Sequence, residues 1–286
     1  MRFLLPAAVF LLMVSVGMSL RPQQLVANWR KLTWSAWSRL LLATFLLPPA
    51  LALILARVLH LSLAGTAGLF MVGATPGAPL LTRNLARRGF DMHLAASYQV
   101  WGAVVTPFMI PPVVFLAAKL YDRHIWIPPR ILLWQIVQKE FLPLLVGVAL
   151  VHYAPAFSAK AFRALNMAGN AVLTLVFAVL LWKMGPDLRN VTPWIVVAVL
   201  LLLIGSIAAI RLLVRGDAVL VRTFAVCNAN RHVGLALLIS GRYMHARLAL
   251  PVVASYALAV AVFMVVAPRI FRPREEAMRR GASLCI

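Results

Sequence analysis

The chain has 286 residues, 63% of them hydrophobic and only 12% charged, and a formal net charge of +21. Its mean hydropathy is +0.91, and its apolar share lies far above that of soluble domains, in which about half of the residues are apolar. This composition excludes a soluble protein, and arginines beside membrane spans account for the charge without a nucleic-acid partner. The phosphate-binding motifs G-x-x-x-x-G-K-[ST] and G-x-G-x-x-G do not occur, which argues against an ATP-driven pump.

Apolar runs of about 20 residues predict an all-α integral membrane protein with nine transmembrane helices in one domain over residues 1–286. In chain order, the predicted spans cover residues 3–20, 40–59, 61–82, 92–117, 131–152, 164–182, 192–213, 222–240 and 248–266. Lysine and arginine concentrate in alternate connections and in the tail, residues 269–286. Under the positive-inside rule, this bias predicts an external N-terminus and a cytoplasmic basic tail, in the inner (plasma) membrane of a cell.

Several spans contain prolines, glycines or polar residues that an ordinary membrane helix would not have. Pro48 and Pro49 predict a kink in the second span. Residues 73–79 include two glycines and two prolines, which remove backbone donors and interrupt the third span in mid-membrane. The eighth span holds polar and charged side chains at its middle, and at that depth such groups require protein or water around them. These residues are Asn228, Asn230, Arg231 and His232.

The third and eighth spans occupy matching places in the two halves of the chain and run in opposite directions. Interrupted spans in matching places are typical of inverted-repeat transporters, in which two discontinuous helices cross at the substrate site. The pattern therefore predicts an inverted repeat with two discontinuous crossing helices. The first, partial repeat covers residues 1–118 and the second covers residues 131–268.

Four motifs resemble those of the bile acid:sodium symporter family, in the family's order and over essentially the whole chain. They are Gly17-Met18-Ser19-Leu20-Arg21-Pro22, Ala74-Thr75-Pro76-Gly77-Ala78-Pro79, Leu142-Pro143-Leu144-Leu145-Val146-Gly147, and Arg222-Thr223 with Asn230-Arg231-His232-Val233-Gly234-Leu235-Ala236. The resemblance implies that spans 2–4 and 7–9 form a core that holds the crossing helices. It implies that spans 1, 5 and 6 form a panel against which the core slides, and that the substrate is a small or amphipathic organic anion.

The chain departs from the family's sodium-coupled members at the sodium sites. Those members have a carboxylate in the second crossing helix and a glutamine four residues later, and both bind sodium. Cys227 and Arg231 stand at these positions, and Leu81 and Thr82 stand where the first crossing helix has small polar ligands. A guanidinium repels a sodium ion in the same small volume, and sodium needs several hard oxygen ligands. The resemblance thus implies that the sodium sites are not functional.

The candidate substrate-binding and crossover residues are Thr75, Pro76, Gly77, Thr82, Gln99, Asn228, Asn230, Arg231 and His232. Arg231 either braces the crossover, by pairing with helix-end carbonyls or with Glu140, or holds the anionic substrate. His232 and Glu140 are the candidates for coupling transport to an ion, because imidazole titrates near neutral pH and Glu140 is an acid near mid-span. No catalytic triad, carboxylate pair or metal-ligand spacing occurs, so we expect no enzyme activity, metal or cofactor.

The sequence therefore predicts a secondary transporter or facilitator of a small organic anion that works by alternating access without sodium coupling. Two alternatives stay open: a non-transporting membrane receptor or sensor on the same fold, and an efflux carrier of the wider superfamily. A polar cavity open to one side favours a carrier, whereas a core closed around Arg231 favours a sensor. The expected partners are the anion and the membrane lipids, and the sequence does not predict an oligomeric state.

Overall fold

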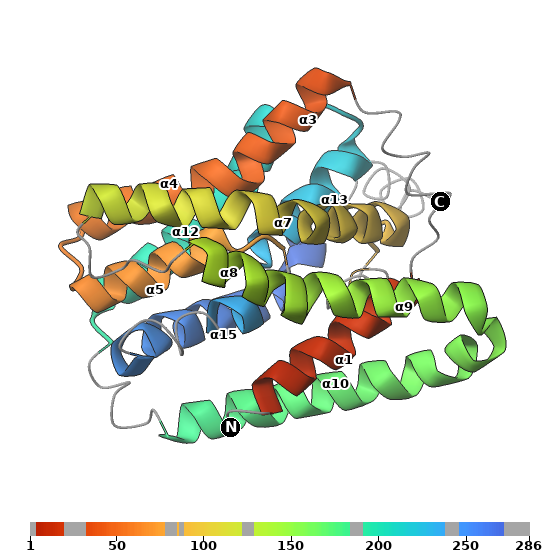
Figure 1. Cartoon of the computed structure of the whole chain (residues 1–286). Helices are drawn as coiled ribbons and strands as arrows, with labels where there is room; N and C mark the ends of the chain where they lie inside the picture. Colours follow the sequence, from red (N-terminus) through yellow and green to blue (C-terminus); the bar gives the residue numbers. More distant parts are fainter. Residues whose placement is uncertain are drawn as a thin grey trace, which may run out of the picture.

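The computed structural model describes residues 4–19, 33–77, 85, 89–121, 129–183, 191–237 and 246–271, and these are almost entirely helical (Figure 1). The elements are α1 (Leu4–Ser19), α3 (Trp34–Leu41), η1 (Leu42–Leu46), α4 (Leu47–Val58), α5 (Leu63–Ala74), α7 (Met92–Tyr121), α8 (Pro129–Ile136), η4 (Val137–Phe141), α9 (Leu142–Tyr153), α10 (Pro155–Lys183), α12 (Pro193–Leu213), α13 (Ala218–Ala229) and α15 (Ala246–Ile270). Two of them, η1 and η4, are single π-helical turns inside longer helices.

Four helical stretches in the described chain are long and apolar enough to cross a membrane. They are Trp34–Val58, Leu94–Leu116, Pro193–Leu213 and Pro251–Ile270. Three shorter apolar helices are Pro6–Met18, Leu63–Ala74 and Ala218–Ala229, and the last two lie in the spans predicted to be interrupted. The protein is therefore an all-helical, multi-pass membrane protein. The number of nine spans and the inverted repeat remain predictions, although each predicted span overlaps a described helix.

Helix packing divides the described helices into two groups, which also lie apart in Figure 1. In the panel group, α1 packs along both α9 and α10. In the core group, α12 packs on α4, α13 and α15, and α5 packs on α4 and α15. Helix α7 packs on α13 and also on α8 and η4, so it connects the groups. This grouping agrees with the core and panel that the family resemblance implied.

Two glycines bring the backbones of α1 and α9 into direct contact inside the panel group. A Cβ atom on Gly17 would overlap the Leu144 carbonyl, and one on Gly147 would overlap the Val14 carbonyl. Small residues are typical of membrane helix interfaces because they let two backbones approach closely. Both glycines belong to motifs that carry the family resemblance, and their role here is to let these two helices touch.

Candidate functional site

The two interrupted helices meet where each one ends. Helix α5 ends at Ala74 and α13 ends at Ala229, and the extended segments that follow pair through an antiparallel β-bridge between Gly77 and Arg231. The backbone N–H of His232 donates to the Pro76 carbonyl (2.8 Å). The crossing predicted from the glycines, prolines and polar residues is thus a direct backbone contact. We call these paired segments, Thr75–Gly77 and Asn230–His232, the crossover.

Only glycine fits at the crossover position of Gly77. A Cβ atom there would lie 2.6 Å from the Cys227 carbonyl oxygen and 2.9 Å from the Tyr98 ring. Both distances are far below van der Waals contact, and the first involves backbone that cannot move without moving α13. Gly77 therefore sets how closely the two interrupted helices approach.

Arg231 is buried at the crossover, with 1% of its surface exposed. Its Nη1 donates to the carbonyls of Thr44 (2.8 Å) and Thr75 (3.2 Å), and its Nη2 lies 3.5 Å from the hydroxyl oxygen of Ser206. The Tyr256 hydroxyl, which donates to the Ala229 carbonyl (2.7 Å), is also a neighbour of the guanidinium. Among the side chains that the structure describes, no carboxylate pairs with Arg231. Neutral backbone oxygens therefore solvate this cation.

The local sequence explains why the Thr44 carbonyl is available to Arg231. An α-helical bond to this oxygen would come from the N–H of residue 48, and a π-helical bond from that of residue 49. Both residues are prolines and have no N–H. The kink predicted at Pro48 and Pro49 is thus the π-turn η1 followed by α4, and its free carbonyl points at the crossover.

The neighbouring Ala43 carbonyl is free for the same reason and accepts from Asn228. The N–H of Leu47 donates to the Leu42 carbonyl across the π-turn, so this N–H does not bond to the Ala43 carbonyl. The Asn228 amide donates to the carbonyls of Ala43 (3.2 Å) and Ser206 (2.7 Å). Asn228 in the last turn of α13 and Arg231 in the crossover therefore use the two carbonyls that η1 releases.

Tyr98 of α7 completes this network, which joins the second predicted span to the crossover. Its hydroxyl donates to the Asn228 side-chain oxygen (2.8 Å), and it lies 3.1 Å from the Thr44 hydroxyl, which then donates to it. Sequence reasoning missed four polar side chains that take part in this network among the described residues: Thr44, Tyr98, Ser206 and Tyr256. Their one signal in the sequence is a polar group inside an apolar run, and that signal is common in membrane helices.

A small cavity lies beside the crossover on the side of the panel group. Met13 and Val16 of α1, Pro76 and Gly77 of the crossover, Gln99 and Ala103 of α7, and His232 line it. Its volume is about 10 Å³, which is room for about one water molecule. His232 and Gln99 are 6% and 3% exposed, and they bring polar groups to its wall. The imidazole Nδ1 also accepts the Leu235 N–H (3.0 Å), so His232 caps the helical turn that follows.

The structure brings together eight of the nine predicted substrate and crossover residues. The side-chain amide of Asn230 donates to the Val226 carbonyl (2.9 Å) and to the sulfur of Met264 (3.0 Å). It therefore caps the C-terminal end of α13 and does not line the cavity. Thr82 lies outside the described residues. Glu140 belongs to η4, which packs on α1 and α7, and its side chain is outside what the structure describes. No cluster of three metal-binding side chains occurs among the described residues.

Comparison with models of protein families gives a match to the sodium bile acid symporter family over residues 6–214. The chain belongs to the sodium bile acid symporter family. Members of the sodium bile acid symporter family are membrane transporters rather than enzymes, which agrees with the buried crossing of two apolar helices. The matched range ends after α12, so the family match does not include α13 and Arg231. No curated protein matches the chain.

Proposed function

We propose that this protein carries a small organic anion across the membrane by alternating access and without sodium. Its membership of a transporter family supports the class of function. The observation that supports the finer proposal is the permanent cation, Arg231, held at the crossing of two interrupted helices. A guanidinium stays protonated in proteins, and in a low-dielectric interior its charge attracts an anion strongly.

The Arg231 guanidinium takes over the role that a bound sodium ion has in coupled relatives. Sodium would need several oxygen ligands, and the carbonyls of Thr44 and Thr75 already accept hydrogen bonds from this side chain. The positive charge at the crossover is therefore always present. We expect uptake that does not depend on a sodium gradient.

We assign Arg231 the bracing role rather than direct contact with the substrate. Its Nη1 donates to two protein carbonyls, those of Thr44 and Thr75. The side chain is almost completely buried, so no face of the guanidinium is open to a substrate in this conformation. The substrate position that we propose is instead the wall formed by Gln99 and His232, next to the crossover. This cavity lies where the core group meets α1, so a separation of the two groups would enlarge it.

A second candidate is a receptor or sensor that keeps the fold and does not transport. The enclosed guanidinium and the cavity of only about 10 Å³ favour it, because neither offers a passage in this conformation. An alternating-access carrier passes through a closed state as well. This one conformation therefore fits both candidates, and only a measurement of transport distinguishes them.

Uptake by proteoliposomes distinguishes these functions. A panel of labelled carboxylates and sulfonates is offered with and without imposed sodium and proton gradients, and reversing each gradient separates uptake from efflux. We expect anion uptake that is equal in both sodium conditions and is lost in Arg231→Ala but kept in Arg57→Ala, which removes an exposed arginine. A large sodium effect would refute sodium independence. Ligand binding without any uptake would favour the sensor.

His232 remains the proposed coupling residue if protons drive the transport. The same vesicles with an imposed proton gradient provide the test. We expect His232→Asn to keep uptake down a concentration gradient and to lose only the part that the proton gradient adds, because asparagine retains a hydrogen-bonding side chain that does not titrate. Equal gradient dependence in both proteins would remove His232 from the coupling proposal.

A further inference from the structure

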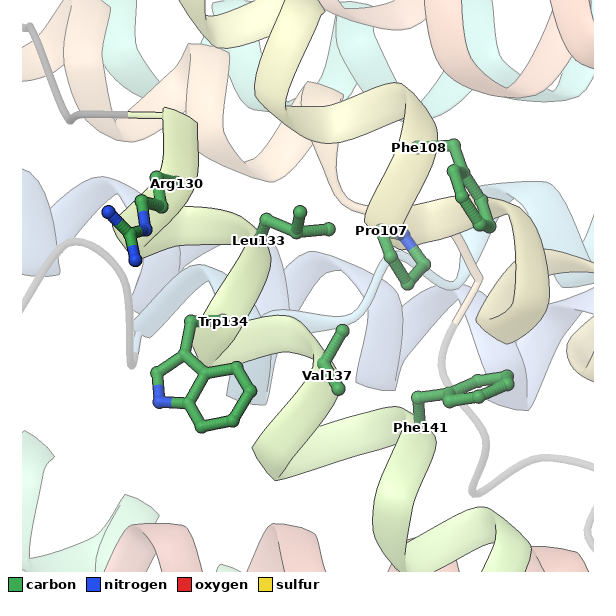
Figure 2. Close-up of a pocket in the computed structure, with 7 residues that line it drawn as sticks. All are labelled: Pro107, Phe108, Arg130, Leu133, Trp134, Val137 and Phe141. Carbon is green, nitrogen blue, oxygen red and sulfur yellow. The ribbon is translucent and has the colours of Figure 1, made fainter.

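A groove of about 910 Å³ lies between α7 and α8, far larger than the cavity at the crossover (Figure 2). Pro107 and Phe108 of α7 form one wall. Leu133, Trp134, Val137 and Phe141 of α8 and η4 form the other wall, with Arg130 at one end. Figure 2 shows Leu133 and Pro107 facing each other, and Phe141 at the end opposite Arg130. We call this feature the α7–α8 groove.

The α7–α8 groove opens towards the hydrocarbon of the membrane. Phe108 belongs to the apolar stretch Leu94–Leu116, which is long enough to cross the bilayer, and 71% of its surface is exposed. Trp134 and Leu133 on the other wall are 61% and 39% exposed. Apolar side chains exposed on a membrane-spanning helix face lipid, so acyl chains reach this groove directly from the bilayer.

The charge of the groove is positive and confined to one end. Arg130 is its only charged residue among those described, it is exposed, and no hydrogen bond joins it to another described residue. It stands in the first turn of α8, where the helix dipole also favours an anion. Trp134 follows one turn later on the same helix. Arginine with a neighbouring tryptophan is typical of the membrane interface, where the cation attracts acidic headgroups.

We infer that the α7–α8 groove binds an acidic phospholipid, with the phosphate on Arg130 and an acyl chain along the apolar walls towards Phe141. Both the shape and the charge of the α7–α8 groove favour this ligand. The long apolar walls suit an acyl chain, and a guanidinium binds phosphate through charge-assisted hydrogen bonds. The walls come from α7, which packs on the core group, and from the α8–η4 segment that leads into the panel group. The bound lipid therefore lies between the two groups.

Native mass spectrometry of the full chain, titrated with phosphatidylglycerol or phosphatidylcholine in a neutral detergent, tests this site. We expect Arg130→Gln to weaken retention of phosphatidylglycerol about fivefold, because an arginine near the surface contributes about 1 kcal/mol towards an acidic lipid. The matched control Arg57→Gln removes another exposed arginine, in α4, and is expected to behave as the unmodified protein. Val137→Trp fills the groove and is expected to reduce retention without changing the charge.

Three results would overturn the lipid site. Equal losses in Arg130→Gln and Arg57→Gln would show only a general charge effect. Equal retention of phosphatidylcholine and phosphatidylglycerol would remove the role of the acidic headgroup. Unchanged retention of phosphatidylglycerol in Val137→Trp would show that no acyl chain occupies the groove. Circular dichroism and the elution volume in size-exclusion chromatography verify that each variant is folded. Lipid retention requires no transport, so this test stays valid even if the proposed transport function is wrong.

Discussion

Arg231 is a buried cation that protein carbonyls solvate in place of water. Placing an arginine at the centre of a membrane helix costs about 2.5–3.5 kcal/mol. A hydrogen bond to a charged group contributes about 1.5–3 kcal/mol. The bonds to Thr44 and Thr75 are therefore sufficient in magnitude to offset the cost of burying the charge. They also join η1 to the end of α5 through a residue of the second interrupted span.

Replacing Arg231 with methionine should destabilise the protein, although it removes a buried charge. The carbonyls of Thr44 and Thr75 would lose their donor inside the protein, and an unsatisfied buried acceptor costs about 1–3 kcal/mol. Thermal unfolding in detergent measures the change, with the exposed Arg57→Met as the control. An Arg231→Met protein that unfolds at or above the temperature of the control would contradict the bracing role.

Gly77→Ala should disrupt the crossover, whereas Gly102→Ala should be tolerated. The alanine Cβ at position 77 would lie 2.6 Å from the Cys227 carbonyl, but at position 102 the nearest heavy atom beyond its own helix, in Pro76, is 3.6 Å away. Overpacking of this kind costs about 1–3 kcal/mol. Both positions lie next to Pro76, but only position 77 meets the backbone of α13, so comparing their unfolding temperatures isolates the backbone contact. Similar temperatures for both would mean that the approach of α5 and α13 is looser than described.

At the scale of elements, η1 and α4 show how two adjacent prolines create acceptors for a distant helix. Proline removes a backbone donor, and the π-turn shifts the remaining bonds by one residue. The carbonyls of Ala43 and Thr44 consequently lack partners within their own helix and accept from Asn228 of α13 and from Arg231 just after it. Consecutive prolines in a membrane span are thus stable here because side chains at the end of α13 and in the crossover supply the missing donors.

A double-mutant cycle of Pro48→Ala and Arg231→Met tests this explanation. Pro48→Ala supplies an N–H within reach of the Thr44 carbonyl, so it should be less harmful in the Arg231→Met background than in the unmodified protein. We expect a coupling free energy of about 0.5–3 kcal/mol, the range found for residues that share a contact. Equal effects of Pro48→Ala in both backgrounds would show that the proline does not release this carbonyl for Arg231.

For the whole molecule, the two helix groups meet at a small apolar cluster beside the crossover cavity. Val16 of α1, Val100 and Ala103 of α7, and Leu144 of α9 form this cluster. Most of the other buried apolar residues belong to a separate, larger cluster inside the core group. In the part of the chain that the structure describes, this cluster between the groups is much smaller than the core cluster, which suits the relative movement in the proposed function.

A disulfide between Ala103→Cys and Leu144→Cys should hold the two groups together and stop uptake. The rationale depends on the proposed alternating access. In a Cys285→Ser background, with Cys227 left buried in α13, we expect uptake to be lost under oxidising conditions and recovered with dithiothreitol. Each single cysteine variant serves as the control. Full uptake by a completely cross-linked protein would show that transport does not require separation at this cluster.

Much of the helical architecture follows from local sequence. The apolar runs predict helices because a membrane requires internal backbone hydrogen bonding, and they coincide with the described helices from α1 to α15. The breaks after Ala74 and Ala229 follow from glycine, proline and polar residues at those points. The membership of the sodium bile acid symporter family is also evident in short motifs. These features depend on neighbours in the chain, so one sequence is sufficient to predict them.

The sequence by itself determined that the two helices are interrupted and that a cation lies between them. Only the tertiary structure decided what surrounds that cation, because Thr44 and Arg231 are separated by 187 positions and meet through the packing of whole helices. The same holds for Tyr98 and Asn228, 130 positions apart. A polar side chain in an apolar run indicates that it needs a partner, and the packing of the helices determines which partner it receives.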